Sequence, residues 1–244
     1  MKILFVGASG SIGSEVLQEC LSDPRVSSVV AFVRRPLPEK VSAHPKLECV
    51  IVKDFAEWSE DVLLKHKDAR GMIWTMGTNT GSMAADLEYP LIFLESMGRV
   101  LEGENDGEGK GSRTQRFRYV HLSGKFVRQD QEEKLWFLET PRKIKGLLET
   151  RALTFAESHS IWQTFIVKPG GVVPRSMFSG GLLNMITPIG ALLGENWSVK
   201  VQELGAFMTH LVVDGDGEES ITENARIVRK GRELLEERKR GGNQ

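Results

Sequence analysis

Three glycines near the start of the chain have the spacing of a phosphate-binding turn. Gly7, Gly10 and Gly13 come directly after an apolar run and open an amphipathic one. The first allows backbone angles that a side chain forbids, the second lets the chain approach a pyrophosphate, and the third lets a helix pack closely on a strand, with the phosphates at the helix N-terminus. This context predicts a dinucleotide site; the alternative is that the glycines serve only the turn. The predicted contacts are Gly7, Ser9, Gly10, Ser11, Ile12 and Gly13.

Two arginines follow about twenty residues later, at the end of the next apolar run. An acidic residue there would bind the ribose hydroxyls of NAD, whereas an arginine accommodates the additional phosphate of NADP. Arg34 and Arg35 stand at this point, and no acid does. The predicted cofactor is therefore NADP(H), unless both arginines are simply solvated loop residues.

Further polar and small residues follow the third and fourth apolar runs. Asp54 either accepts a hydrogen bond from the adenine amino group or caps the next helix. Met76, Gly77 and Thr78 are expected where the cofactor riboses pass. No His, Cys or Asp cluster has metal-ligand spacing, so no metal site is predicted.

The elements that must position these residues alternate between short apolar runs and longer amphipathic segments. That alternation is typical of parallel strands connected by crossover helices. We expect an α/β fold with a doubly wound parallel (Rossmann) sheet, in one domain over residues 1–244. The expected strands are residues 3–6, 29–33, 47–52, 72–76, 117–122 and 163–167. The expected helices are residues 11–22, 84–101, 131–158 and 222–240.

Three segments depart from this alternation. Residues 102–116 are rich in glycine and charge, which predicts a mobile surface loop. Pro141 should break or kink the long helical segment unless a helix begins there. Residues 172–244 are expected to form a small substrate-side lid of loops and helices, ending in the final helix, at the strand ends where open α/β sheets bind ligands.

Composition restricts the partners and the compartment. The formal net charge is −1, from 32 basic and 33 acidic residues, so no global field attracts nucleic acid or an anionic membrane. No apolar run is long enough to span a bilayer. The first residues already read as a core strand, with no room before them for a signal peptide, and Cys20 and Cys49 suit a reducing compartment. We expect a cytoplasmic protein whose partner is a small-molecule substrate or another protein.

In order and spacing, several short motifs together resemble the atypical short-chain dehydrogenases/reductases, and within them the NmrA-like and Tat-interacting-protein-like NAD(P)-binding proteins. The resemblance extends over nearly the full length. Its carriers are residues 7–13, 33–36, Asp54, 76–78, 86–89, 122–124, 145–146, 168–170 and 223–225. It implies a catalytic Ser123, a Lys145 that holds the cofactor ribose and assists catalysis, and cofactor contacts from Pro169 and Gly170.

One catalytic residue of the family is missing. The reductases carry a Tyr four residues before the Lys, which gives its proton to the developing alkoxide. In this chain that position is Pro141. Tyr119 is expected to pack inside a strand, and His121 to be packed or hydrogen-bonded. Trp136 and Phe137 either face the pocket or, as we expect, pack in the core.

Two functions remain open from the sequence. The first is an NADP(H)-dependent oxidoreductase or isomerase that acts on a small carbonyl or enone compound without the usual Tyr. The second is a non-catalytic regulator or scaffold that senses NADP(H) and reports to a protein partner, for which the loss of a general acid costs nothing. Loss of the cofactor altogether is the least favoured alternative, because it makes the glycine turn a relic.

Overall fold

The computed structural model describes residues 1–103, 115–175 and 195–241, and its centre is a parallel sheet. Seven strands lie in the order β3-β2-β1-β4-β5-β6-β9, every neighbouring pair parallel, as in a Rossmann-like α/β fold. The strands are β1 (Lys2–Val6), β2 (Ser28–Val33), β3 (Leu47–Ile51), β4 (Gly71–Trp74), β5 (Phe117–Leu122), β6 (Trp162–Lys168) and β9 (Ile221–Glu223). The order reverses direction between β1 and β4, and open sheets bind ligands at such a point.

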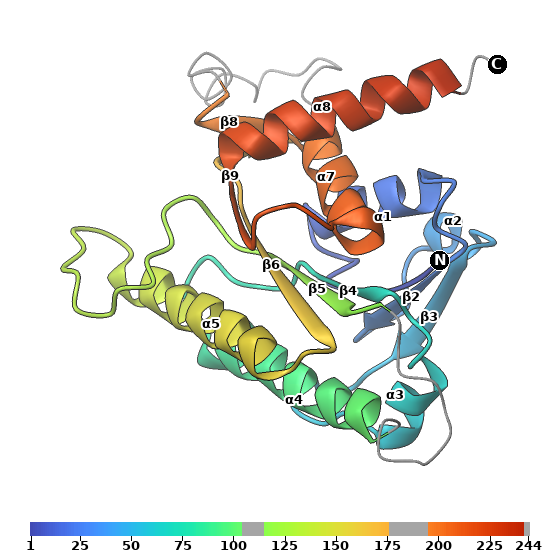
Figure 1. The fold of residues 1–244 in the computed structure, drawn as a ribbon, viewed down its shortest axis with the longest axis horizontal. Coiled ribbons are helices and arrows are strands. Elements are labelled where there is room, and N and C mark those ends of the chain that lie inside the picture. The colour runs from blue at the N-terminus through green and yellow to red at the C-terminus, as the bar shows by residue number, and fades with distance from the viewer. Residues whose placement is uncertain (104–114, 176–194, 242–244) are drawn as a thin grey trace.

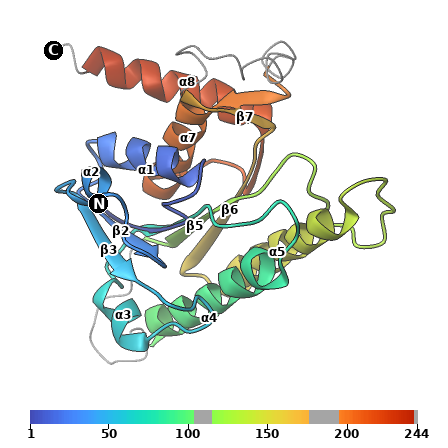
Figure 2. The ribbon, with the colours of Figure 1, turned by 180° about the vertical axis from the view of Figure 1, so that it is seen from behind.

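Helices cover both faces of the sheet (Figures 1 and 2). One face carries α1 (Gly13–Ser22) and α7 (Val201–Asp214), with α8 (Asn224–Gly241) outside α7. The other carries α3 (Glu60–Lys65), α4 (Tyr89–Glu102) and α5 (Glu139–Ser158). The short α2 (Glu39–Ser42) precedes β3, and β7 (Gly171–Val173) pairs with β8 (Ser198–Lys200) in a separate parallel sheet.

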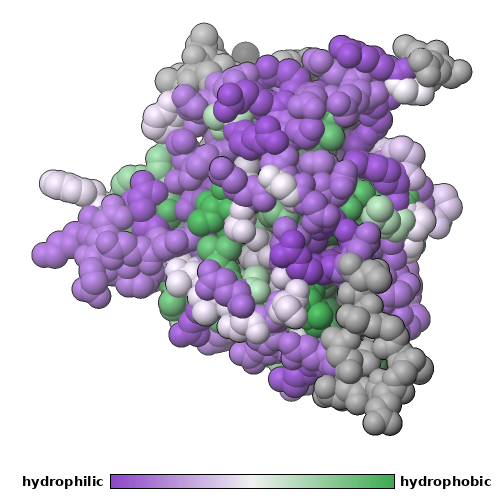
Figure 3. Space-filling view, in the orientation of Figure 1, coloured by the Kyte–Doolittle hydropathy of each residue, from purple (hydrophilic) through white to green (hydrophobic). Residues whose placement is uncertain are grey.

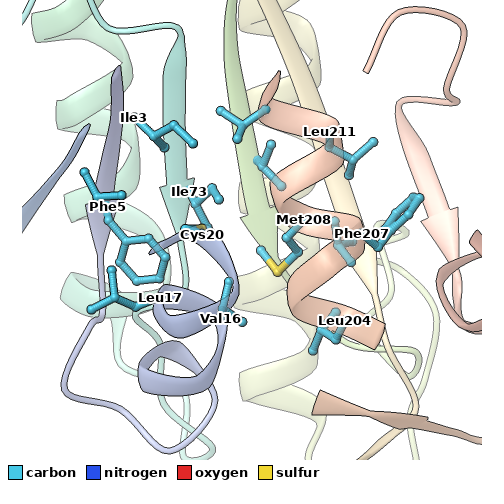
Figure 4. Close-up of a cluster of buried hydrophobic side chains, with 14 of the residues drawn as sticks. Ile3, Phe5, Val16, Leu17, Cys20, Ile73, Leu204, Phe207, Met208 and Leu211 are labelled. Carbon is cyan, nitrogen blue, oxygen red and sulfur yellow. The ribbon is translucent and has the colours of Figure 1, made fainter. Parts of the chain in front are cut away.

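A separate apolar core lies on each face. The first joins the sheet to α1 and α7, and Figure 4 shows Val16 of α1 on the side toward Met208 of α7, with Leu17 beside Phe5 of β1. The second joins the sheet to α3, α4 and α5 and is rich in aromatic rings. The strands are buried on both sides, which explains their continuous apolar sequence.

The predicted strands agree with the observed ones within two residues at each end. The predicted helix at 84–101 begins with a π-helical turn, η1 (Ala84–Glu88), before α4. Pro141 lies in the first turn of α5, where the missing N–H breaks no helical hydrogen bond, so the helix begins there instead of kinking. Leu138 precedes α5 with a left-handed φ of 47°.

The C-terminal part contributes to the core more than the sequence indicates. Helix α7 is buried along nearly its whole length, between the sheet, α1 and α8. Helix α8 occupies the range of the predicted final helix, and its outer surface is largely hydrophilic (Figure 3). Residues 176–194 of the expected lid and most of the expected loop at 102–116 lie outside the described residues. No described helix has both the length and the apolar character to cross a membrane.

Candidate functional site

The glycine turn connects β1 to α1 and folds tightly against the end of β4. Gly7 has a φ of +96°, and a Cβ built on it would stand 2.7 Å from the backbone N of Met76. A Cβ on Gly13 would stand 2.1 Å from the Gly7 carbonyl oxygen. Gly10 is less confined, since its nearest neighbour would lie at 3.3 Å. Gly7 and Gly13 are therefore required for close packing, which leaves the turn around Gly10 open to a ligand.

A pocket of about 790 Å³ opens beside this turn, at the carboxyl ends of β1, β2 and β4. Its lining residues are Gly7, Ala8, Ser9, Gly10, Phe32, Val33, Arg34, Arg35, Pro36, Leu37, Pro38, Phe55, Thr75, Met76 and Gly77. Both arginines are exposed, and within the described residues neither forms an ion pair. The backbone of the glycine turn lines one part of this pocket and could bind a pyrophosphate. The two guanidinium groups line another part and could bind a further phosphate group.

The other predicted cofactor contacts lie outside that lining. Asp54 is exposed, and its Oδ1 accepts a hydrogen bond from the backbone N of Ala56 at 2.9 Å, so its carboxylate holds a turn. Ile12 packs against the core of α1. A Cβ on Gly170 would stand 2.2 Å from the Trp197 carbonyl oxygen, so this glycine permits close packing. Ser11 directly follows Gly10 in the chain, and Pro169 directly precedes Gly170.

A buried carboxylate organises the loop after β4 and positions Lys145. Asp86, 1% exposed, accepts hydrogen bonds from the backbone N of Thr78 and Ser82 at 2.7 and 2.8 Å, and from the Thr78 hydroxyl at 2.5 Å. Lys145 Nζ lies 3.5 Å from Asp86 Oδ1 and would stand 3.4 Å from a Cβ on Gly77. The ammonium group of α5 is thereby held at the edge of the pocket.

A second buried carboxylate, Glu149, lies one helical turn further along α5 and binds Ser123. The Ser123 hydroxyl donates to Glu149 Oε1 at 2.5 Å, while Lys168 Nζ and Gln129 Nε2 donate to Oε2 at 3.0 and 3.1 Å. Glu149 is fully buried, and Lys168 is 8% exposed. Because a hydroxyl has one hydrogen, Ser123 in this arrangement can only accept a hydrogen bond from a further partner.

Pro141 occupies the position of the missing Tyr and contacts the loop after β4. A Cβ built on Gly81 would stand 2.8 Å from Pro141 Cα, and Gly81 has a φ of +82°. The first turn of α5 thus lies directly against the loop that Asp86 organises.

Tyr119 and His121 lie at alternate positions of β5, on the face that Ser123 shares, and His121 is close enough to Lys145 to feel its charge. The expected packing is confirmed: Tyr119 is fully buried, and its hydroxyl lies 3.0 Å from His121 Nδ1. Burial and, less strongly, the positive charge of Lys145 lower the pKa of His121 to about 3. His121 is therefore neutral at physiological pH.

The expectation of core packing for the aromatic pair before α5 is wrong. The side chain of Trp136 is fully exposed, and Phe137 is 56% exposed. They belong to a loop that precedes α5, outside the apolar face of that helix, so no core surface is available to them.

Glu149 and Asp86 hold Ser123, Lys145 and the loop after β4 in place, and neither was assigned a role from the sequence. Glu149 stands four residues after Lys145, a spacing that puts both on one face of a helix and would have signalled a shared site. Asp86 belongs to the 86–89 motif of the family resemblance, but its hydrogen bonds with Thr78 depend on the folded loop and give no sequence signal. Within the described residues, no group of three or more His, Cys, Asp or Glu is placed to hold a metal ion.

Comparisons with known proteins place this geometry among Rossmann-like folds. No family model matches the chain. Leucinostatins biosynthesis cluster protein T of Purpureocillium lilacinum is 31% identical over 77 residues, which is 32% of this chain and only 28% of that protein. The mitochondrial protein FMP52 of Candida albicans, a distant relative, is 22% identical over 186 residues, covering 76% of this chain and 73% of its own.

Solved structures share the fold over most of the chain. A short-chain dehydrogenase/reductase family oxidoreductase from Burkholderia thailandensis has a TM-score of 0.65 at 14% identity, covering 97% of this chain and 96% of its own. The dTDP-glucose 4,6-dehydratase of Bacillus anthracis, in complex with NAD, has a TM-score of 0.63 at 14% identity, covering 97% and 81%. Yeast methylglyoxal/isovaleraldehyde reductase Gre2, complexed with NADPH, has 0.59 at 15% identity, covering 91% and 75%. The chain therefore shares its Rossmann-like α/β fold with these enzymes.

Proposed function

We propose that the protein binds NADP(H) in the pocket beside the glycine turn. The observation that carries this proposal is the placement of Gly7, Gly10, Arg34 and Arg35 around one pocket of about 790 Å³ at the switch point of the sheet. The glycine backbone suits the pyrophosphate, and the two guanidinium groups, which form no ion pair within the described residues, suit a phosphate on the adenine ribose. Gre2 and the dehydratase, whose structures hold NADPH and NAD, share this fold and lend support.

We further propose that the protein is an oxidoreductase or isomerase that acts on a small carbonyl or enone compound. The cofactor, when bound, supplies or accepts hydride. Lys145, held by Asp86 beside Gly77, would bind the cofactor ribose. Ser123 would contact the reacting oxygen of the substrate, because β5 ends beside the end of β4.

The hydrogen bond from Ser123 to Glu149 offers a proton route that needs no Tyr. A substrate hydroxyl can pass its proton to Ser123 Oγ while the original Oγ hydrogen moves to Glu149 Oε1. In the reverse direction, a protonated Glu149 returns its proton to Oγ, and Ser123 protonates the carbonyl oxygen. Lys168 and Gln129 hold the carboxylate in position for either direction.

One observation favours the alternative of a non-catalytic NADP(H) sensor. Pro141 lies against Gly81 where the family has its Tyr, so the direct proton donor is absent and that part of the site is closed by backbone. A sensor needs the cofactor pocket alone, and its protein partner would respond to the bound cofactor.

Calorimetric titration with NADPH and NADH tests cofactor binding, and consumption of NADPH with a panel of aldehydes, ketones and enones tests catalysis. We expect NADPH to bind more tightly than NADH and at least one carbonyl compound to be turned over. Ser123→Ala and Lys145→Ala should then abolish turnover. NADPH binding without any turnover would establish the sensor in place of the enzyme.

A further inference from the structure

Three half-exposed aromatic rings from separate segments gather near the end of the sheet. Phe126 lies in the loop after β5, Phe137 in the loop before α5, and Trp197 before β8. The ring centroid of Phe126 is 6.4 Å from that of Phe137 and 6.2 Å from that of Trp197. Their side chains are 46%, 56% and 45% exposed. We call these three residues the aromatic rim.

Backbone hydrogen bonds connect two of the three segments of the aromatic rim, those of Phe126 and Trp197, to residues 169–171 after β6. The N of Lys125 donates to the Pro169 carbonyl oxygen at 2.8 Å, and the N of Gly171 donates to that of Trp197 at 2.7 Å. Phe126 also lies three residues after Ser123, a distance of at most about 11 Å along an extended chain. The aromatic rim therefore lies close to Ser123, beside the segment that follows β6.

Arg142 links two members of the aromatic rim and brings a positive charge to it. Its Nε donates to the Phe126 carbonyl oxygen at 2.5 Å and its Nη1 to that of Phe137 at 3.3 Å. The guanidinium carbon lies 4.9 Å from the Phe137 ring centroid. In the part of the chain that the structure describes, Arg142 forms no ion pair with a carboxylate. Its remaining N–H groups are available to an anion.

A second cation lies across the aromatic rim. Lys125 Nζ stands 5.3 Å from the Trp197 ring centroid and 4.0 Å from Glu223 Oε2. Glu223 is mostly exposed, so this ion pair only partly offsets the ammonium charge. Among the described residues, the surface thus combines adjoining apolar rings with one cation that has no carboxylate partner and one that is partly paired.

We propose that the aromatic rim with Arg142 is a substrate subsite for a small molecule that carries an aromatic or other bulky apolar group and an anionic group. Clustered exposed apolar side chains next to a reactive centre are typical of ligand sites, and the cations supply charge complementarity for an acid. The apolar group packs on Phe126, Phe137 and Trp197, and the anion pairs with Arg142. The subsite rests on the proposed function, since it places the substrate beside Ser123.

Binding of 1-anilinonaphthalene-8-sulfonate, which has fused rings and a sulfonate, tests the subsite without knowledge of the natural substrate. The titration is performed with saturating NADPH, which blocks the dinucleotide pocket. We expect saturable binding that Phe126→Ala, Phe137→Ala and Trp197→Ala each weaken by about fivefold or more, as expected for loss of a partly buried ring. Arg142→Gln should weaken this probe similarly but leave the uncharged N-phenyl-1-naphthylamine within about twofold.

Trp136 provides the matched control, because its fully exposed ring belongs to no ring pair of the aromatic rim. Trp136→Ala should leave binding unchanged, and NADPH titration of every variant reports whether the fold is intact. The subsite is wrong if wild type does not bind the probe, if the three variants bind it normally, or if Trp136→Ala weakens it equally. Failure of wild type to bind NADPH, with the probe results as expected, would overturn the proposed function and leave the aromatic rim as a ligand site without a role in that reaction.

Discussion

The Ser123 hydroxyl donates its only hydrogen to the buried carboxylate of Glu149, at an Oγ–Oε1 distance of 2.5 Å. Ser123 therefore meets a substrate oxygen as a hydrogen-bond acceptor until a proton moves. The family resemblance implied a catalytic Ser123 and no partner for its hydroxyl. Glu149 is that partner, and it supplies the proton route on which the enzyme proposal depends.

Glu149→Gln tests this relay. The amide cannot take the proton from Ser123, so we expect turnover to fall by about 10² to 10⁴ while the Kd for NADPH stays within twofold. Glu149→Asp should restore part of the activity. Glu157→Gln, the same change at an exposed position of α5, is the control and should leave turnover unaffected. Full activity in Glu149→Gln would show that the proton follows another route.

Lys168→Met tests how far Glu149 depends on its cationic partner. Removal of the ammonium leaves a buried carboxylate unpaired, and we expect a loss of about 3–5 kcal/mol in the free energy of unfolding. Urea denaturation measures it. Adding Glu149→Gln should recover a large part of the loss, because the uncompensated charge is gone. Additive losses in the double variant would contradict the proposed pairing.

The double variant Arg34→Ala, Arg35→Ala tests cofactor selectivity. Loss of charge-assisted hydrogen bonds to a phosphate should weaken NADPH by about 10- to 100-fold and leave NADH within twofold. Isothermal titration calorimetry gives both constants. Lys40→Ala removes one exposed positive charge outside the pocket lining and should change neither. Equal weakening of both cofactors would refute the phosphate role.

His121 should make stability fall in mild acid. Its pKa of about 3 lies below the ordinary value of about 6.5, so only the unfolded chain takes up this proton between those values. The contribution of neutral His121 to the free energy of unfolding is complete above pH 6.5 and is lost as the pH falls toward 3. Between pH 7 and 5 the loss is about 2 kcal/mol. His121→Asn should reduce the difference in unfolding free energy between these pH values by that amount, and an unchanged difference would refute the buried neutral state.

Gly81 and Gly217 form a natural pair for testing the contact with Pro141. Both have a positive φ, +82° and +88°, but a Cβ on Gly217 would meet nothing within 4 Å. Gly217→Ala should cost about 1 kcal/mol from backbone strain alone. Gly81→Ala should cost at least about 1 kcal/mol more, because its Cβ overlaps Pro141. Thermal unfolding measures the loss of stability in each variant. Equal losses would indicate that the start of α5 can shift away from the new Cβ at little cost.

The strands and the glycine turn could be predicted because their signals are local. Buried parallel strands appear in the sequence as short apolar runs. The spacing of Gly7 and Gly13, directly after such a run, is visible within one short segment. Helix α7 gave no such signal, since it is covered on several sides and lacks a polar stripe. The three-residue β9 is too short for any periodicity to show.

Only part of the candidate site could be predicted from the sequence, because some of its contacts join segments that are distant in the chain. Arg34 and Arg35 could be placed at the pocket because strand ends meet at one edge of the sheet. The partners of Ser123 come from α5 and β6, and the direction of its hydroxyl hydrogen depends on all of them together. Trp136 was misjudged because composition favours burial of an aromatic ring, whereas its loop offers no core to receive it.

The packing of α1 against α7 has a consequence for synthesis on the ribosome. The helix that begins at the glycine turn is made within the first 22 residues, yet the helix that covers its apolar face ends at Asp214. A Cβ on Gly205 would stand 2.6 Å from Glu19 Cγ, so the two helices fit only at close range. For most of translation the segment that contains the glycine turn therefore carries an apolar helix face that its partner helix has not yet covered.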